Sequence, residues 1–158
     1  MTRILKIGGS ILTDKNRELT ARPDEIMRVA KEIASQPDDV VLVHGAGSFG
    51  HIPAKRFGLP HEFSRLGLRV THNSVARLCE LVVEALSLAG VECLPVHPLS
   101  CLLLRDGRID SFFIEPVKEM LKDGIMPVLH GDVAMDVTGK AAIVSGDQLV
   151  AHLARALQ

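Results

Sequence analysis

Short apolar runs rich in β-branched residues alternate along this chain with segments whose apolar residues recur at helical spacing. The runs occupy residues 4–7, 40–43, 91–96 and 125–129. The helical stripes between them occupy residues 26–33, 75–86 and 114–121. Such alternation is typical of βαβ units, in which helices bury both faces of a parallel sheet. We therefore expect an α/β fold with a mainly parallel central sheet flanked by helices.

Two turn signals interrupt this alternation. Asp106-Gly107 and Thr138-Gly139 each lie between two apolar runs, which predicts two small β-hairpins at the rim of the sheet. A final helix is predicted to begin at Ser145, because Ser145 and Gln148 have the spacing of a capping box, and to run through Leu157.

Composition narrows the class of protein. The 158 residues, 47% of them hydrophobic, fit one domain over residues 1–158, and the net charge of -1 offers no surface for nucleic acid or an anionic membrane. No apolar run approaches the roughly 18 residues of a membrane span, and the N-terminus has no signal-peptide layout, so the cytoplasm is expected. Cys79, Cys93 and Cys101 lack C-x-x-C spacing, and we identify no metal-ligand set.

A glycine-rich loop follows the second predicted strand. Its sequence is His44-Gly45-Ala46-Gly47-Ser48-Phe49-Gly50-His51, a G-x-G-x-x-G pattern between two histidines. Glycines let the backbone approach a phosphate and direct several N–H groups at it. A helix beginning just after the loop would add the positive end of its dipole. The loop is therefore predicted to bind an anion.

Two familiar phosphate loops do not fit this segment. A dinucleotide fingerprint needs an acidic residue about 20 residues further on at the end of a strand, and none is present. A P-loop needs Lys and Ser or Thr where His51 and Ile52 stand. What remains is a phosphate loop in which His51 can donate a charge-assisted hydrogen bond, while His44 ends the strand as a structural residue. The alternative, in which His51 bonds only the backbone, stays open.

Three further features lie at predicted strand ends, where α/β sheets bind their ligands. Lys6 is followed by Gly8 and Gly9, which can present N–H groups beside its charge, although a simple glycine turn with an edge lysine is the alternative. Lys15 stands in a polar segment and could be an ordinary loop lysine. Gly131-Asp132 follows a strand, and Asp147 opens the last helix, where it could cap that helix or orient Lys6.

Taken in order, four motifs of the chain resemble the amino acid kinase superfamily, most closely its isopentenyl phosphate kinases. They are Lys6-Ile7-Gly8-Gly9-Ser10, the loop from His44 to His51, Gly131-Asp132-Val133 and Ser145-Gly146-Asp147-Gln148. His51 is the discriminating residue. Most of the superfamily phosphorylates carboxylates or carbamate and lacks it, whereas isopentenyl phosphate kinases and the similar fosfomycin kinases carry a histidine there.

The resemblance implies a role for each motif in a three-layer fold. Lys6 and Lys15 would stabilise the phosphoryl group in transfer, and Asp147 would position the lysines. Gly8, Gly9 and Ser10, with Gly47, would hold the phosphates of ATP. The acceptor phosphate would be bound by residues of two helix starts: Ala46, Gly47, Gly50, His51 and Gly146. The apolar tail of the acceptor is expected against residues 66–83.

The implied activity is ATP- and Mg²⁺-dependent phosphorylation of isopentenyl phosphate to isopentenyl diphosphate, a step of isoprenoid precursor synthesis. The alternatives are a kinase for another phosphate or phosphonate such as fosfomycin, and a non-catalytic phosphate-binding protein without a nucleotide site. The resemblance also implies that residues 1–158 correspond to the N-terminal acceptor-binding half of the fold, with the nucleotide-binding half absent from this chain. The resemblance also implies a homodimer, because proteins of the superfamily commonly form dimers.

Overall fold

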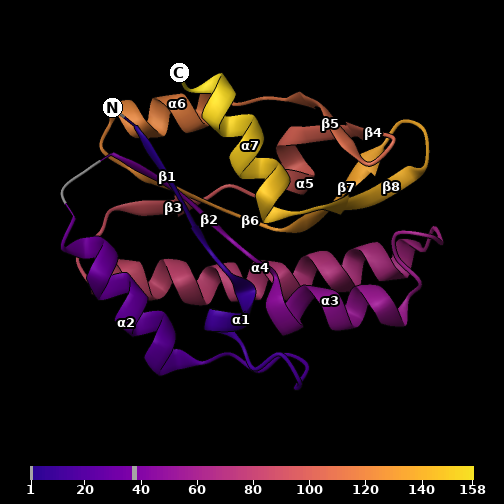
Figure 1. Cartoon of the computed structure of the whole chain (residues 1–158), viewed down its shortest axis with the longest axis horizontal. Helices are drawn as coiled ribbons and strands as arrows, with labels where there is room; N and C mark the ends of the chain where they lie inside the picture. Colours follow the sequence, from indigo (N-terminus) through magenta and orange to yellow (C-terminus); the bar gives the residue numbers. More distant parts are fainter. Residues whose placement is uncertain (1, 37–38) are drawn as a thin grey trace.

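The four predicted strands form one parallel sheet in the order β1-β2-β6-β3 (Figure 1). They are β1 (Arg3–Ile7), β2 (Val40–His44), β3 (Cys93–Pro95) and β6 (Met126–His130). The computed structural model describes residues 2–36 and 39–158. The expected mainly parallel central sheet is confirmed.

Helices cover both faces of this sheet (Figure 1). Helices α1 (Gly9–Leu12), α2 (Pro23–Ala34), α3 (Gly47–Arg56) and α4 (Arg65–Leu88) lie below the sheet in Figure 1, and α6 (Glu115–Lys122) and α7 (Gly146–Ala156) lie above it. Because side chains alternate along a strand, Leu42 of β2 packs with α2 and α4 in one buried cluster, and Val41 and Val43 pack with α6 and α7 in another. The expected three-layer arrangement is confirmed.

The two predicted hairpins form and also pair with each other. The first joins β4 (Leu102–Arg105) to β5 (Arg108–Phe112) after the short helix α5 (Pro98–Cys101), and the second joins β7 (Asp132–Asp136) to β8 (Lys140–Val144). Leu104 pairs with Asp136 between parallel β4 and β7, so the strands make a second sheet in the order β5-β4-β7-β8. That pairing is non-local, and the turn signals did not predict it.

Helix α4 begins ten residues earlier than its apolar stripe predicts. The Oγ atom of Ser64 accepts a hydrogen bond from the N–H of Gly67 (2.9 Å), which caps the helix. The buried residues of this first part are small or polar, Gly67, Thr71 and Ser74, so hydrophobic periodicity does not register them. Among the described residues, no helix combines the length and apolar character that crossing a bilayer requires.

Four chain segments meet at the carboxyl end of the parallel sheet. β1 leads into α1, β2 into α3, β6 into β7 through Gly131 alone, and β8 into α7. Helix α3 was expected just after the glycine loop but begins inside it, at Gly47. The residues that the sequence singles out therefore converge on one region.

Candidate active site

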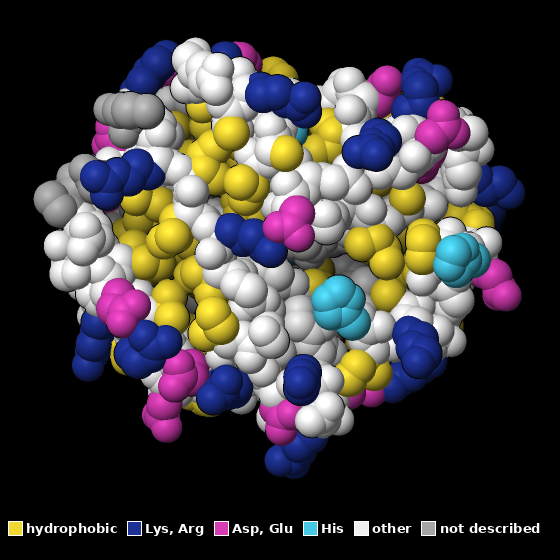
Figure 2. Space-filling model, in the orientation of Figure 1, with side chains coloured by type: hydrophobic (Ala, Val, Ile, Leu, Met, Phe, Trp, Pro, Cys, Tyr) yellow, Lys and Arg dark blue, Asp and Glu magenta, His cyan; other side chains and the backbone are white. Residues whose placement is uncertain are grey.

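A cleft of about 350 Å³ opens where these segments meet. Figure 2 shows it as a hollow near the centre of this face, with contacting cationic and acidic side chains on one side, and with a histidine and apolar side chains also at its border. Ten of the residues predicted from the sequence line this cleft: Lys6, Gly9, Ser10, Lys15, Ala46, Gly47, Gly50, His51, Gly146 and Asp147. Gly8 does not line it and instead precedes α1 as its N-cap.

The floor of the cleft is a backbone-to-backbone contact between the two glycine loops. A Cβ atom built on Gly9 would lie 2.3 Å from the Gly47 nitrogen, and one on Gly45 would lie 2.5 Å from the Gly9 nitrogen. No side chain fits between atoms this close. The glycines are therefore required because they let the two loops approach closely, and this approach in turn forms the anion site.

Thr13 fixes the start of α3 from below. Its hydroxyl donates to the Gly9 carbonyl (2.9 Å) and accepts from the Ser48 N–H (3.1 Å). Gly47, between these loops, has a φ of +52°, a conformation that glycine adopts at little cost. Thr13 thus ties α1 to α3.

Two helix N-termini border one space above Gly131. A Cβ atom on Gly131 would lie 3.6 Å from the Ala46 nitrogen, at the start of α3, and 3.7 Å from the Gly146 nitrogen, at the start of α7. The first N–H groups of a helix have no acceptor within the helix, and the helix dipole places partial positive charge there. This space can therefore hold an anionic oxygen.

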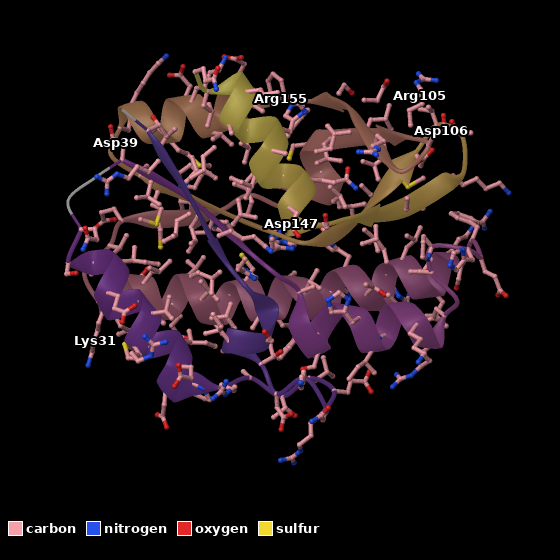
Figure 3. The ribbon with its side chains drawn as sticks, in the orientation of Figure 1. Lys31, Asp39, Arg105, Asp106, Asp147 and Arg155 are labelled. Carbon is pink, nitrogen blue, oxygen red and sulfur yellow. The ribbon has the colours of Figure 1, made fainter. Side chains whose placement is uncertain are left out.

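The side chains of Lys6 and Asp147 form an ion pair at the border of the cleft. Lys6 Nζ lies 2.8 Å from Asp147 Oδ1. Figure 3 labels Asp147 at the N-terminal end of α7, above the loops that enter α1 and α3. Ser145 caps the same helix through a bond from the Gln148 N–H (3.2 Å) to its Oγ atom, so Asp147 sits in a fixed first turn and orients the lysine.

His51 stands on the second turn of α3, with its side chain exposed at the cleft. Its ring makes no hydrogen bond or ion pair to another described residue, so the backbone-bonded alternative is not observed. Lys15 reaches the cleft from the segment after α1. Both side chains are available to a ligand.

One wall of the cleft is apolar and was only partly predicted. Of residues 66–83, where the apolar tail was expected, Thr71 and Val75 line the cleft. Besides Val75, its apolar residues are Ala46, Ala54, Val133, Ile143 and Val144. Most of the wall therefore comes from α3 and from the β7–β8 hairpin, whose position over the cleft depends on the second sheet.

Asp132 is buried at the wall of the cleft, where it follows Gly131. Its carboxylate accepts from His72 Nδ1 (2.9 Å), from the Leu99 N–H (3.2 Å) and from the Val133 N–H (2.8 Å). The hydrogen bond from His72 to Asp132 raises the pKa of His72 despite partial burial. Asp132 therefore holds α4, α5 and β7 together, a role that its position after a glycine did not indicate.

A cluster of histidines lies beneath the cleft, and only the position of His44 could be anticipated from the sequence. His44 and His130 are fully buried. Nδ1 of His97 lies 2.7 Å from Nε2 of His130, and the ring centroids of His72 and His97 are 5.4 Å apart. These residues come from four separate segments, so no local spacing identifies them. Burial lowers the pKa of His44 to about 3, with a further contribution from the charge of His130.

Comparisons with known proteins agree with this architecture. The family model described as "Amino acid kinase family" matches residues 1–158. The isopentenyl phosphate kinase of Methanothermobacter thermautotrophicus is 35% identical over 94% of this chain, and that of Thermoplasma acidophilum is 38% identical over 98%. A solved structure described as "X-ray structures of isopentenyl phosphate kinase" superposes with a TM-score of 0.95 and 34% identity over 99% of this chain and 68% of its own.

The chain spans 60% and 62% of the length of the two curated relatives. The match to the family model extends over all 158 residues and includes the glycine loops, Lys6 and Asp147 that build the cleft. This chain is therefore a member of the amino acid kinase family.

Proposed function

We propose that this chain forms the acceptor-binding part of a kinase that transfers the γ-phosphoryl group of ATP to isopentenyl phosphate. The observation that carries the proposal is the combination, in one cleft, of an unpartnered His51, two helix N-termini and an apolar wall. A small monophosphate with a hydrocarbon tail has the matching chemistry. The relatives named isopentenyl phosphate kinase support the same substrate.

The reaction requires stabilisation of negative charge and does not require a general base. A phosphate monoester carries about -1.5 to -2 charges near pH 7, and its oxygen is already a nucleophile, so no general base is needed. That oxygen forms a bond to the γ-phosphorus while the bond from this phosphorus to the bridging oxygen of ADP breaks. Fixed positive charge and N–H groups must hold two anions together through this step.

The lysines are proposed to act on the group in transfer. Lys6 lines the cleft, where Asp147 holds its ammonium in one direction, and Lys15 lines the same cleft from the segment after α1. Because Asp147 is mostly exposed, it can orient Lys6 without removing the field that the lysine exerts on a bound phosphate.

The acceptor phosphate is proposed to lie in the space above Gly131, between the Ala46 and Gly146 nitrogens. His51 would donate to it from the second turn of α3, and Gly47 and Gly50 would border the same phosphate. The hydrocarbon tail would then extend along Val75, Val133 and Ile143. In this placement the polar and apolar ends of the substrate each meet surface of their own kind.

ATP is proposed as the second substrate, with its phosphates against Gly8, Gly9, Ser10 and Gly47. Among the described residues no group of three or more His, Cys, Asp or Glu side chains could hold a metal ion. Mg²⁺ at kinase sites is bound mainly by substrate phosphates and water with one or two carboxylates, which this donor set permits. When bound, it would neutralise charge on the nucleotide.

The experiment is isothermal titration of isopentenyl phosphate into the wild-type protein and the variant His51→Ala. We expect the variant to lose about tenfold or more in affinity, as for a hydrogen bond to a charged group. His61→Ala is the matched control, because His61 is exposed beyond α3 and outside the cleft. Unchanged affinity in His51→Ala would refute the acceptor assignment.

Two parallel titrations separate the alternatives. Preferential binding of fosfomycin would assign the cleft to a phosphonate. Absence of ATP binding in the presence of Mg²⁺ would limit this chain to acceptor recognition.

We further propose a homodimer in the cytoplasm, the compartment that supplies ATP, and no nucleic-acid partner, in keeping with a net charge of -1. Light scattering after size exclusion tests the dimer.

A further inference from the structure

Two histidines end adjacent strands at the same level beneath the cleft. His44 is the last residue of β2, His130 is the last residue of β6, and the two are paired in the register of the sheet. Both are fully buried, and their rings stack with centroids 5.7 Å apart. Each is followed directly by a glycine that lines the cleft, Gly45 or Gly131.

Each ring holds the carbonyl of the glycine that follows it. Nδ1 of His44 lies 2.9 Å from the Gly45 oxygen, and Nδ1 of His130 lies 2.9 Å from the Gly131 oxygen. A carbonyl oxygen can only accept, so Nδ1 carries the proton in both rings. Nε2 of His130 is then the acceptor for Nδ1–H of His97 at 2.7 Å, which fixes the tautomer of both rings of that pair.

Holding these oxygens also fixes the next N–H groups. A peptide unit is planar and trans, so its N–H points opposite to its C=O. With the Gly45 oxygen turned to the His44 ring, the Ala46 N–H is turned away from that ring, and its nitrogen borders the space above Gly131. Glycine alone would let this peptide rotate, and a rotated carbonyl would present its negative end to an anion.

We propose that His44 is a positioning residue of the phosphate cradle, using Nδ1–H to hold the Gly45 carbonyl so that the Ala46 N–H faces the acceptor phosphate, and that His130 fixes the Gly131 carbonyl beside it in the same way. This proposal rests on the proposed function. It gives these two residues a different role from His51, which faces the ligand directly.

The surroundings of His44 indicate that it orients the Gly45 carbonyl and does not act through a positive charge. Its Nε2 atom is buried and has no hydrogen-bond partner among the described residues. Burial lowers the pKa of both His44 and His130, so both rings stay neutral near pH 7. A neutral ring contributes one oriented donor and no net charge, so its role is to position the loop rather than to attract the anion.

The test compares His44→Asn with His44→Leu. The side-chain nitrogen of Asn is as many bonds from Cα as Nδ1 of His, so Asn can keep the bond to Gly45, whereas Leu fills the space without a donor. We expect affinity for isopentenyl phosphate within about threefold of wild type in His44→Asn and a loss of about tenfold or more in His44→Leu. His152→Asn and His152→Leu, at a histidine of α7 outside the cleft, are the matched controls.

Urea unfolding of each variant separates positioning from packing. If His44 only filled space, affinity would follow stability, and the better-filling Leu would bind at least as well as Asn. Equal affinities in the two variants, or stronger binding by Leu, would overturn the proposal. Where His44→Leu does not fold, nitrogen NMR of the wild-type rings decides. Protonation of His44 or His130 at Nε2 near pH 7 would contradict the assigned hydrogen bonds.

Titration of inorganic phosphate in parallel keeps the two proposals distinct. If the wild-type protein binds isopentenyl phosphate and His44→Leu binds it with the same affinity, the positioning role is wrong and the proposed function stands. Binding of inorganic phosphate alone would remove isopentenyl phosphate as the acceptor, and the same variants would still test the cradle. Binding of neither ligand would overturn both.

Discussion

Lys6 Nζ lies 2.8 Å from Asp147 Oδ1 and joins the end of the first strand to the first turn of the last helix. The side chains are 35% and 79% exposed. An exposed ion pair of this kind contributes about 1 kcal/mol or less to stability because water screens it. The contact therefore affects the direction of the Lys6 ammonium at the cleft more than the stability of the fold.

Replacing Asp147 by Asn is expected to lower kcat by about tenfold to a hundredfold, because Lys6 loses its fixed position, with little change in melting temperature. Lys6→Ala should lower kcat further while changing acceptor affinity less, because the charge matters most in the transition state. Steady-state kinetics measures kcat of each variant, and calorimetry measures its acceptor affinity and melting temperature. Glu115→Gln breaks the exposed Lys118–Glu115 pair of α6 as a control and should leave turnover unchanged. An equal effect of the two carboxylate changes would contradict the role of Asp147.

Gly131→Ala is expected to weaken binding of isopentenyl phosphate and of inorganic phosphate by about tenfold. The added methyl group would occupy the space 3.6 Å from the Ala46 nitrogen and 3.7 Å from the Gly146 nitrogen, which are ordinary contacts. Folding should therefore be retained, and calorimetry with a parallel urea titration separates the two effects. The control is Gly139→Ala in the β7–β8 turn, where a methyl group meets nothing within 4 Å. Tight phosphate binding by Gly131→Ala would place the anion elsewhere.

Local signals predicted the elements that carry the site. Ser145 caps α7 as expected, and Gly124 adopts a φ of +71° just after α6, because capping and glycine conformation depend on a few neighbouring residues. Lys6, His51 and Asp147 could be singled out because each lies beside a short recognisable pattern: a strand that runs into two glycines, a glycine loop and a helix cap.

Non-local contacts account for what the sequence did not predict. Pairing of β4 with β7 places Val133 over the cleft, and nothing in either hairpin specifies its partner. The contact of His97 with His130 likewise joins segments that are adjacent only in the folded chain. Such features depend on the packing of whole layers, whereas the phosphate loops depend on short stretches of backbone.

Gly9→Ala is expected to destabilise the protein by about 2 to 3 kcal/mol or more, whereas Gly8→Ala should be tolerated. A methyl group on Gly9 would lie 2.3 Å from the Gly47 nitrogen, a backbone atom that cannot move aside alone, while one on Gly8 would lie 3.9 Å from Ser10 Oγ. Urea unfolding of the two adjacent variants provides the comparison. Similar stability in both would mean that the loops do not require their close contact.

Acidification is expected to destabilise the protein through its buried neutral histidines. Burial lowers the pKa of His44 from 6.5 to about 3 and also lowers that of His97 and His130. Below pH 6.5 the unfolded chain therefore binds protons at these positions that the folded chain excludes, and stability falls as the pH falls. His72 acts in the opposite direction. Its pKa is raised by Asp132, so its stabilisation is present at low pH and lost as the pH rises through its folded-state pKa.

The contribution of His44 can be isolated by comparing the wild-type protein with His44→Asn in urea titrations between pH 7 and pH 4.5. A single buried neutral histidine changes the free energy of unfolding by about 1.4 kcal/mol per pH unit in this window, with stability increasing with pH. The variant should show a slope smaller by about that amount, because Asn does not titrate and the remaining groups are common to both proteins. Parallel pH profiles would mean that His44 is protonated in the folded protein, which would also be incompatible with its buried, unpartnered Nε2 atom.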